Sequence, residues 1–215
     1  LAVAVHHLGD FPESIRGEKV CGLIWCCTGP LEQAEEALRE ARETAEPLFE
    51  HVGPMPYPVL QSQFDGLYPP GHEWYWKGAF IREIPEEAIA EHRRFAEVPT
   101  PQSTMHLYPI NGAAHRTPGE ATAWGHREAN WSMVIAGVDP DPANRDRITT
   151  WARDYWQAIH PYSSGAAAYV NFMMEEGRDR IQATYGGNYK RLREVKTRYD
   201  PNNFFHVNQN IEPLD

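Results

Sequence analysis

Eighteen prolines divide this 215-residue chain into short segments. A proline locks its own φ angle and lacks the backbone N–H that an interior helical residue donates. The prolines between residues 54 and 70 therefore predict a long loop without helix, and Pro47 and Pro161 predict the ends of two helices. Pro85 is followed by two glutamates, which is typical of a helix start, because acidic residues favour the positive end of the helix dipole. We expect many short elements rather than a few long ones.

Hydrophobic periodicity predicts the elements between these breaks. Apolar runs of strand length predict strands at residues 1–8, 20–27, 73–84, 103–110 and 130–138, with a short sixth segment at 121–126. Apolar stripes with helical spacing predict helices at residues 31–46, 85–96, 148–159, 175–184 and 188–199. Strands and helices do not alternate regularly, so the predicted fold class is α+β, with a large, mostly antiparallel sheet and helices on one face.

The composition argues against several classes of function. The formal net charge of -10 repels a phosphate backbone, so nucleic acid is not an expected partner. No apolar run approaches the roughly 18 residues that a membrane-spanning helix requires. Three clustered cysteines predict reduced, packed thiols rather than a disulfide framework: Cys21, Cys26 and Cys27. The histidines form no helical pair beside a glutamate, so no metal site is predicted.

The most specific signal lies near the C-terminus. Residues 185–211 read YGGNYKRLREVKTRYDPNNFFHVNQNI, and residues 168–172, just upstream, read AYVNF. The longer segment resembles the closing signature of the berberine bridge enzyme family, and the shorter one resembles the Tyr-x-Asn segment that lies beside the flavin ring in that family. The residues of the longer segment that match are Tyr185, Gly186, Asn188, Tyr189, Arg191, Leu192, Val195, Lys196, Tyr199, Asp200, Pro201, Asn203, Phe205, Gln209 and Ile211. PYPVLQSQFDGLYPPGHEWYWK and WARDYW are similar to bacterial members, so the resemblance covers nearly the whole chain.

The resemblance implies a two-domain architecture. An N-terminal domain binds FAD, a second domain lays an antiparallel sheet over the isoalloxazine ring, and a C-terminal helical segment returns to the FAD domain. We therefore expect residues 1–165 to form the substrate-binding domain and residues 166–215 the C-terminal segment, with the FAD-binding domain missing from this chain. The expected partners are that domain, a small-molecule substrate and, through the exposed interface, a second copy of the chain. The chain opens with LAVAVHHL and shows no signal peptide, but its true N-terminus is expected to be missing, so the sequence does not assign a compartment; a cytoplasmic location is favoured.

The implied activity is that of an FAD-dependent oxidoreductase. A hydride passes from a substrate carbon to flavin N5, a side chain takes a proton, and oxygen is the expected final acceptor. The portion present here is expected to be inactive by itself. The AYVNF segment implies that Tyr169 and Asn171 lie beside the flavin. On an extended segment, residues two apart present their side chains to the same face.

One departure from the family pattern lies at Phe172, where members with a tyrosine base carry Tyr. A phenyl ring cannot accept a proton, so the candidates for the base are Tyr75, His106, His126 and Tyr169. Spacing does not choose among them, and a base from the missing domain or a more acidic substrate hydroxyl would also suffice.

Alternative interpretations remain open on the sequence. Tyr169 is also typical of a core aromatic residue, and His106 and His126 are also typical of hydrogen-bonded structural residues. The chain as a whole would also fit a flavin-free or catalytically dead binding module that retains the fold, or a subunit that pairs with a separate FAD subunit. The aromatic content indicates a ring-bearing or sugar-like substrate.

Overall fold

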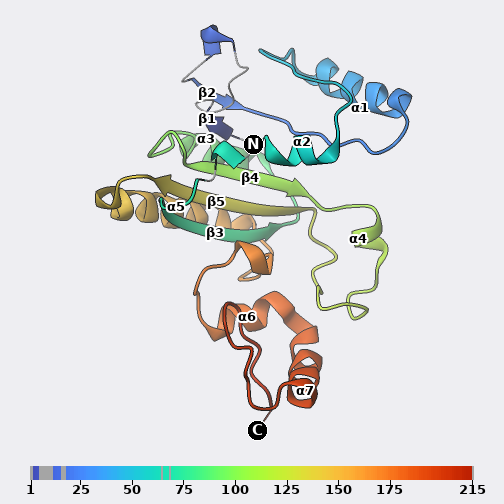
Figure 1. Ribbon diagram of the computed structural model, residues 1–215, viewed down its shortest axis with the longest axis vertical. Helices are drawn as coiled ribbons and strands as arrows, with labels where there is room; N and C mark the ends of the chain where they lie inside the picture. The colour runs from blue at the N-terminus through green and yellow to red at the C-terminus, as the bar shows by residue number, and fades with distance from the viewer. Residues whose placement is uncertain (1, 5–11, 16–17, 64, 68, 215) are drawn as a thin grey trace.

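In the part of the chain that the computed structural model describes, five strands form one antiparallel sheet in the order β2-β1-β4-β5-β3 (Figure 1). The structure describes residues 2–4, 12–15, 18–63, 65–67 and 69–214. The strands are β1 (Ala2–Ala4), β2 (Lys19–Cys21), β3 (Glu73–Ile81), β4 (Thr104–Pro109) and β5 (Trp131–Asp139). Every described strand pair is antiparallel, which confirms the predicted sheet. The sixth segment, residues 121–126, is a loop, so that part of the prediction was wrong.

The predicted helices are confirmed, with small shifts at their ends. The α-helices are α1 (Leu31–Thr44), α2 (Tyr57–Ser62), α3 (Glu86–Arg94), α4 (Ala113–Arg116), α5 (Arg145–Ile159), α6 (Arg178–Tyr185) and α7 (Tyr189–Tyr199). Helix α2 contradicts the predicted loop between residues 54 and 70. It is possible because Pro56 caps the helix and Pro58 lies in its first turn, where a missing N–H removes no helical hydrogen bond.

The predicted strand at residues 20–27 ends early, at Cys21. Cys21 lies opposite Ala2, the first residue of β1, so the residues beyond it have no strand partner in the described part of the chain. Leu23, Ile24 and Trp25 consequently lie 71%, 53% and 47% exposed. The prediction of packed thiols was also wrong, because all three cysteines are exposed, and they form no disulfide: Cys21, Cys26 and Cys27.

The main core lies between the sheet and helix α5, which crosses behind β3 and β5 in Figure 1. Its buried members are Ala79, Ile81, Met105, Met133, Ile135, Ala152, Tyr155 and Ile159. Gly137 on β5 allows this close packing, since a Cβ there would lie 2.7 Å from the carbonyl oxygen of Ile148 in α5. Helix α5 packs on β3 and β5, and α3 packs against α5, which confirms that helices cover one face of the sheet.

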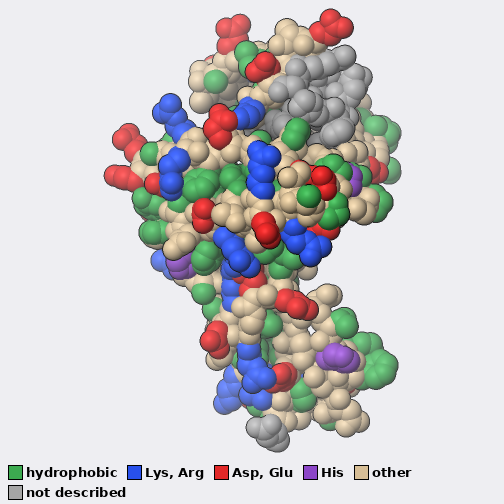
Figure 2. Space-filling view, turned by 90° about the vertical axis from the view of Figure 1, so that its left-hand side faces the viewer, with side chains coloured by type: hydrophobic (Ala, Val, Ile, Leu, Met, Phe, Trp, Pro, Cys, Tyr) green, Lys and Arg blue, Asp and Glu red, His purple; other side chains and the backbone are tan. Residues whose placement is uncertain are grey.

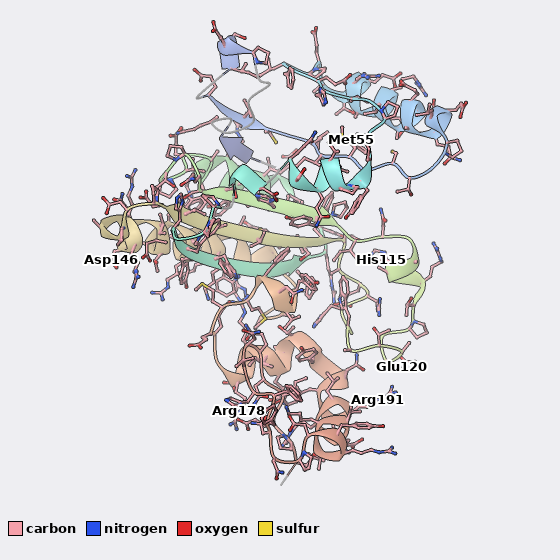
Figure 3. All side chains as sticks on the ribbon, in the orientation of Figure 1. Met55, His115, Glu120, Asp146, Arg178 and Arg191 are labelled. Carbon is pink, nitrogen blue, oxygen red and sulfur yellow. The ribbon has the colours of Figure 1, made fainter. Side chains whose placement is uncertain are left out.

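Helices α6 and α7 form a C-terminal part below the sheet, and the space-filling view shows the molecule narrowing between the two (Figures 1 and 2). The loop after α4 joins this part to the sheet. Asn188 donates through Nδ2 to the carbonyl oxygen of Gly119 at 2.8 Å. Arg191 lies beside Glu120 in Figure 3 and donates to its carbonyl oxygen at 3.1 Å. Within the described residues, no helix is both long and apolar enough to cross a membrane.

Candidate active site

The face of the sheet opposite α5 carries a row of aromatic side chains. Alternation along a strand places every second residue on the same face, and the register aligns these residues across β4, β5 and β3. On β3, Tyr75 and Ala79 face α5, so the residues next to them in the strand project from the opposite face of the sheet. We call this opposite face the aromatic face and define it by Trp74, Trp76, Phe80, His106 and Tyr108.

Residues 167–172, which we call the covering segment, pass along the edge of β3 and onto the aromatic face. The backbone N–H of Phe80 donates to the carbonyl oxygen of Ala167 at 3.2 Å. Gly78 lacks a side chain, and a Cβ at this position would lie 2.9 Å from the carbonyl oxygen and 3.0 Å from the Cβ of Phe172. Phe172 can therefore lie on the sheet, where its ring centroid is 5.4 Å from that of Tyr108.

Tyr169 and Asn171 meet through their side chains. The amide Nδ2 of Asn171 donates to the hydroxyl oxygen of Tyr169 at 2.7 Å. Their backbone is a 3-10 turn spanning Val170–Phe172 rather than the extended segment that we predicted, because the N–H of Phe172 donates back to the carbonyl oxygen of Tyr169 at 2.8 Å. The hydrogen bond still brings the two side chains together, and Asn171 is exposed.

A second contact places Tyr169 at the end of the aromatic face. Its ring lies 6.1 Å from that of Trp124 and 5.1 Å, edge to face, from that of Phe172. Trp124 in turn stacks on Phe80 at 5.8 Å. The covering segment, the loop after α4 and β3 thus form one continuous aromatic group.

His106 lies in the centre of a hydrogen-bonded row on β4. Its Nδ1 is 3.1 Å from the hydroxyl oxygen of Tyr108, and its Nε2 is 2.9 Å from Oγ1 of Thr104. Burial lowers the pKa of His106 to about 4, so the imidazole is neutral at neutral pH. Burial also raises the pKa of Tyr108, whose side chain nevertheless stays accessible, with the residue 43% exposed.

His126 joins the aromatic face to the C-terminal part. Its ring lies 5.1 Å from that of Phe80, and its Nε2–H donates to the carbonyl oxygen of Ala183 in α6 at 3.0 Å. Its Nδ1 is 3.5 Å from a carboxylate oxygen of Glu128. The geometry therefore gives His126 a bridging position at the edge of the group.

Tyr75 lies on the other face of the sheet. Its hydroxyl accepts a hydrogen bond from Nε of Arg153 at 2.9 Å, and its ring packs against the core beside α5. The structure thus brings together Tyr169, Asn171, His106 and His126, the last through Phe80, and leaves Tyr75 apart. Our sequence reasoning did not select Tyr108, although its position two residues after His106 on one strand was a usable signal.

A buried ion cluster fastens the chain after the covering segment to the edge of β3. Glu176 pairs with both Lys77 and Arg180, and the three side chains are only 8%, 16% and 9% exposed, respectively. Arg180 also donates to the carbonyl oxygen of Gly78, and both cations lie 4.9 Å from the ring centroid of Trp156. Burial lowers the pKa of Arg180, while Glu176 opposes this effect. The cluster therefore holds the chain that follows the covering segment against β3.

Comparison with known proteins shows which family this chain is similar to. Residues 168–212 match the family described as berberine and berberine like. The chain is 28% identical over 190 residues to an FAD-linked oxidoreductase of Dictyostelium discoideum, which covers 86% of the chain and 41% of that relative.

Two solved structures share the fold. The crystal structure of aclacinomycin oxidoreductase has a TM-score of 0.66 and 21% identity, covering 86% of this chain and 43% of its own. BBE-like #28 from Arabidopsis thaliana has the same TM-score and identity, covering 87% and 46%. These matches confirm the resemblance to the berberine bridge enzyme-like FAD-linked oxidoreductases and show that this chain spans less than half of their length.

The polar groups beside the aromatic face fit the edge of a flavin ring. Tyr169 accepts from Asn171, so its own O–H is left to donate, and Oδ1 of Asn171 accepts no hydrogen bond from the described residues. One donor beside one acceptor matches the alternating carbonyl and N–H groups on the pyrimidine edge of an isoalloxazine. Among the described residues, no three His, Cys, Asp or Glu side chains come together as they would around a metal ion.

Proposed function

We propose that this chain is the substrate-binding part of an FAD-dependent oxidoreductase. The observation that carries the proposal is the Tyr169–Asn171 pair, which presents a donor and an acceptor beside an aromatic face. FAD, when bound, supplies the acceptor for a hydride from a substrate carbon, with oxygen as the final acceptor. In this proposal Tyr169 and Asn171 hold the polar edge of the ring, and the aromatic face lies against the substrate.

The proposed substrate carries a ring and a hydroxyl group. Aromatic side chains contribute a large apolar contact area with a few polar atoms, an arrangement that suits flat rings and the apolar faces of sugars. The rings of Trp74 and Trp76 pack edge to face at 6.5 Å on this side of β3. The indole nitrogen of Trp76 is buried and finds no hydrogen-bond acceptor within the described part of the chain, which supports a polar ligand nearby.

We further propose that residues 166–215 contact an FAD-binding domain of the same protein, while residues 1–165 form the substrate-binding domain. The C-terminal loop supports this, since Phe204, Phe205 and Val207 are 76%, 74% and 76% exposed. The loop is nevertheless well organised, because the carboxylate of Asp200 accepts from the backbone N–H groups of Phe204 and Phe205 at 2.7 and 3.0 Å. An ordered loop that displays several apolar side chains is typical of an interface.

The test begins with the visible spectrum of the intact protein that contains these 215 residues. We expect bound flavin in a ratio near one per chain and a shifted absorption spectrum in Asn171→Leu, because the amide contacts the ring. Gln157→Leu is the matched control, since Gln157 is an exposed amide on α5, on the far side of the sheet. An intact protein that retains no flavin would refute the proposal and favour a flavin-free binding module.

A further inference from the structure

Tyr108 is the one phenol of the aromatic face that is both accessible and connected to a second titratable group. It is 43% exposed, its hydroxyl oxygen lies 3.1 Å from Nδ1 of His106, and its ring lies 5.4 Å from that of Phe172. Phe172 belongs to the same turn as Asn171, so the ring of Tyr108 lies beside the turn that we propose to hold the flavin.

The other candidates for proton transfer are engaged elsewhere. The hydroxyl of Tyr169 accepts from Asn171, and Nε2 of His126 donates to a backbone carbonyl of α6. Tyr75 lies on the face that packs against α5, where it accepts from Arg153. None of these three combines an accessible hydroxyl on the aromatic face with a neighbouring group that can receive a proton.

The row on β4 provides a path for a proton. A neutral imidazole has one N–H and one bare nitrogen. If Nε2–H donates to Oγ1 of Thr104 at 2.9 Å, then Nδ1 accepts the O–H of Tyr108. In this tautomer the hydroxyl oxygen of Tyr108 has lone pairs free to accept a hydrogen bond from a ligand hydroxyl.

Resting on the proposed function, we propose that Tyr108 is the catalytic residue that takes the proton of the substrate hydroxyl and that His106 takes the proton of Tyr108. FAD, when bound, would supply the two-electron acceptor for the hydride that leaves the substrate carbon as its C–H bond breaks. The substrate O–H bond breaks, and its proton binds the hydroxyl oxygen of Tyr108. The proton that Tyr108 held binds Nδ1 of His106, and the substrate becomes a carbonyl compound.

The transfer needs no strong base. Loss of a hydride from an alcohol leaves a protonated carbonyl, which is a much stronger acid than an imidazolium ion, so the proton moves downhill even onto a buried histidine. Because burial raises the pKa of Tyr108, the phenol keeps its proton at neutral pH and can accept another only by passing its own on. Thr104 orients the imidazole ring through its hydrogen bond to Nε2. His106 and Thr104 are positioning residues, because both act through Tyr108 and neither contacts the substrate.

The first test reads the proton positions directly, without turnover. The intact protein is labelled with ¹⁵N-histidine, and the His106 signals are assigned by their loss in His106→Gln. We expect the ¹⁵N chemical shifts of the wild type to show an unprotonated Nδ1 and a protonated Nε2. In Tyr108→Phe, which removes the hydroxyl that donates to Nδ1, the chemical shift of Nδ1 should change. Tyr199→Phe, a change on an exposed tyrosine of α7, should leave the signal unchanged. A proton on Nδ1, or no response to Tyr108→Phe, overturns the inference.

The second test measures flavin reduction by rapid anaerobic mixing with D-glucose, or with the first member of a sugar panel that reduces the wild-type flavin. We expect Tyr108→Phe to slow reduction about 100-fold, as is common for loss of a general acid–base group, with little change in half-saturation. Equal rates in Tyr108→Phe and wild type overturn the inference and leave the proposed function intact. Absence of bound flavin would refute the proposed function, and a flavin that no sugar reduces would contradict the proposed substrate class. Neither result alters the first test, which reads the protonation of the His106 nitrogens without turnover.

Discussion

Replacing Gly78 with alanine should displace the covering segment without altering the sheet. The added Cβ would lie 2.9 Å from the carbonyl oxygen of Phe172, 3.0 Å from its Cβ and 3.1 Å from the Cβ of Ala168. Overpacking of this kind costs about 1 to 3 kcal/mol. Alanine is favoured over glycine within a strand by about 0.5 to 1 kcal/mol, so the expected net loss of stability lies between about 0 and 2.5 kcal/mol, with a central value near 1 kcal/mol.

The assay is equilibrium urea unfolding of the intact protein, comparing midpoints at unchanged slope. Gly53→Ala is the matched control, because no atom lies within 4 Å of the position where its Cβ would stand. Ala168→Gly added to Gly78→Ala should recover part of the loss, since it removes one of the three close contacts but leaves the Phe172 carbonyl in place. Equal midpoints for the two single glycine variants would refute the reasoning that Gly78 makes room for the covering segment.

Three further outcomes are expected. Burial lowers the pKa of His106 to about 4, below its ordinary value of 6.5, so its contribution of about 3 kcal/mol to the free energy of unfolding is present above pH 6.5 and is lost as the pH falls toward 4. Urea unfolding midpoints across this pH range should therefore fall less in His106→Gln than in the wild type, and parallel curves for the two proteins would contradict this expectation. Glu176→Gln leaves two buried cations without their carboxylate and should cost about 3 to 5 kcal/mol, against almost nothing for exposed Glu83→Gln; similar thermal midpoints would show that the cluster does not fasten the C-terminal part. The 215-residue chain expressed alone should self-associate in analytical ultracentrifugation, and the double variant Phe204→Ser, Phe205→Ser should self-associate less. A wild-type monomer at all concentrations would argue against an exposed interface.

The position of Tyr75 illustrates what periodicity leaves undecided. Alternation showed that Tyr75 and Trp76 must point to opposite sides of their strand, but either side was equally consistent with the sequence. The packing of α5 on β3 assigns Tyr75 to the core face, where Arg153 from α5 donates to its hydroxyl. A strand carries no local signal for which of its faces a distant helix will cover, so this choice required the tertiary structure.

Local chemistry determined much of the rest. Repeating apolar residues located β3, β5 and α5, and Pro85 marked the start of α3, because these patterns follow from backbone geometry within a few residues. The signature after residue 168 indicated the family before any fold was known, and the comparison with known proteins confirmed that resemblance. The short helix α2 was missed because a proline in the first turn and a proline that breaks a helix look alike in sequence.

The candidate site itself depends on contacts between residues far apart in the chain. The sequence by itself placed Tyr169 and Asn171 near each other and His106 on a strand, because these are relations between close neighbours. Only the tertiary structure brought Phe172 onto the ring of Tyr108, since this contact requires the covering segment to cross β3 at Gly78. Sequence periodicity specifies which residues share a face, whereas the packing of separate segments decides which faces meet, and the second decision created this site.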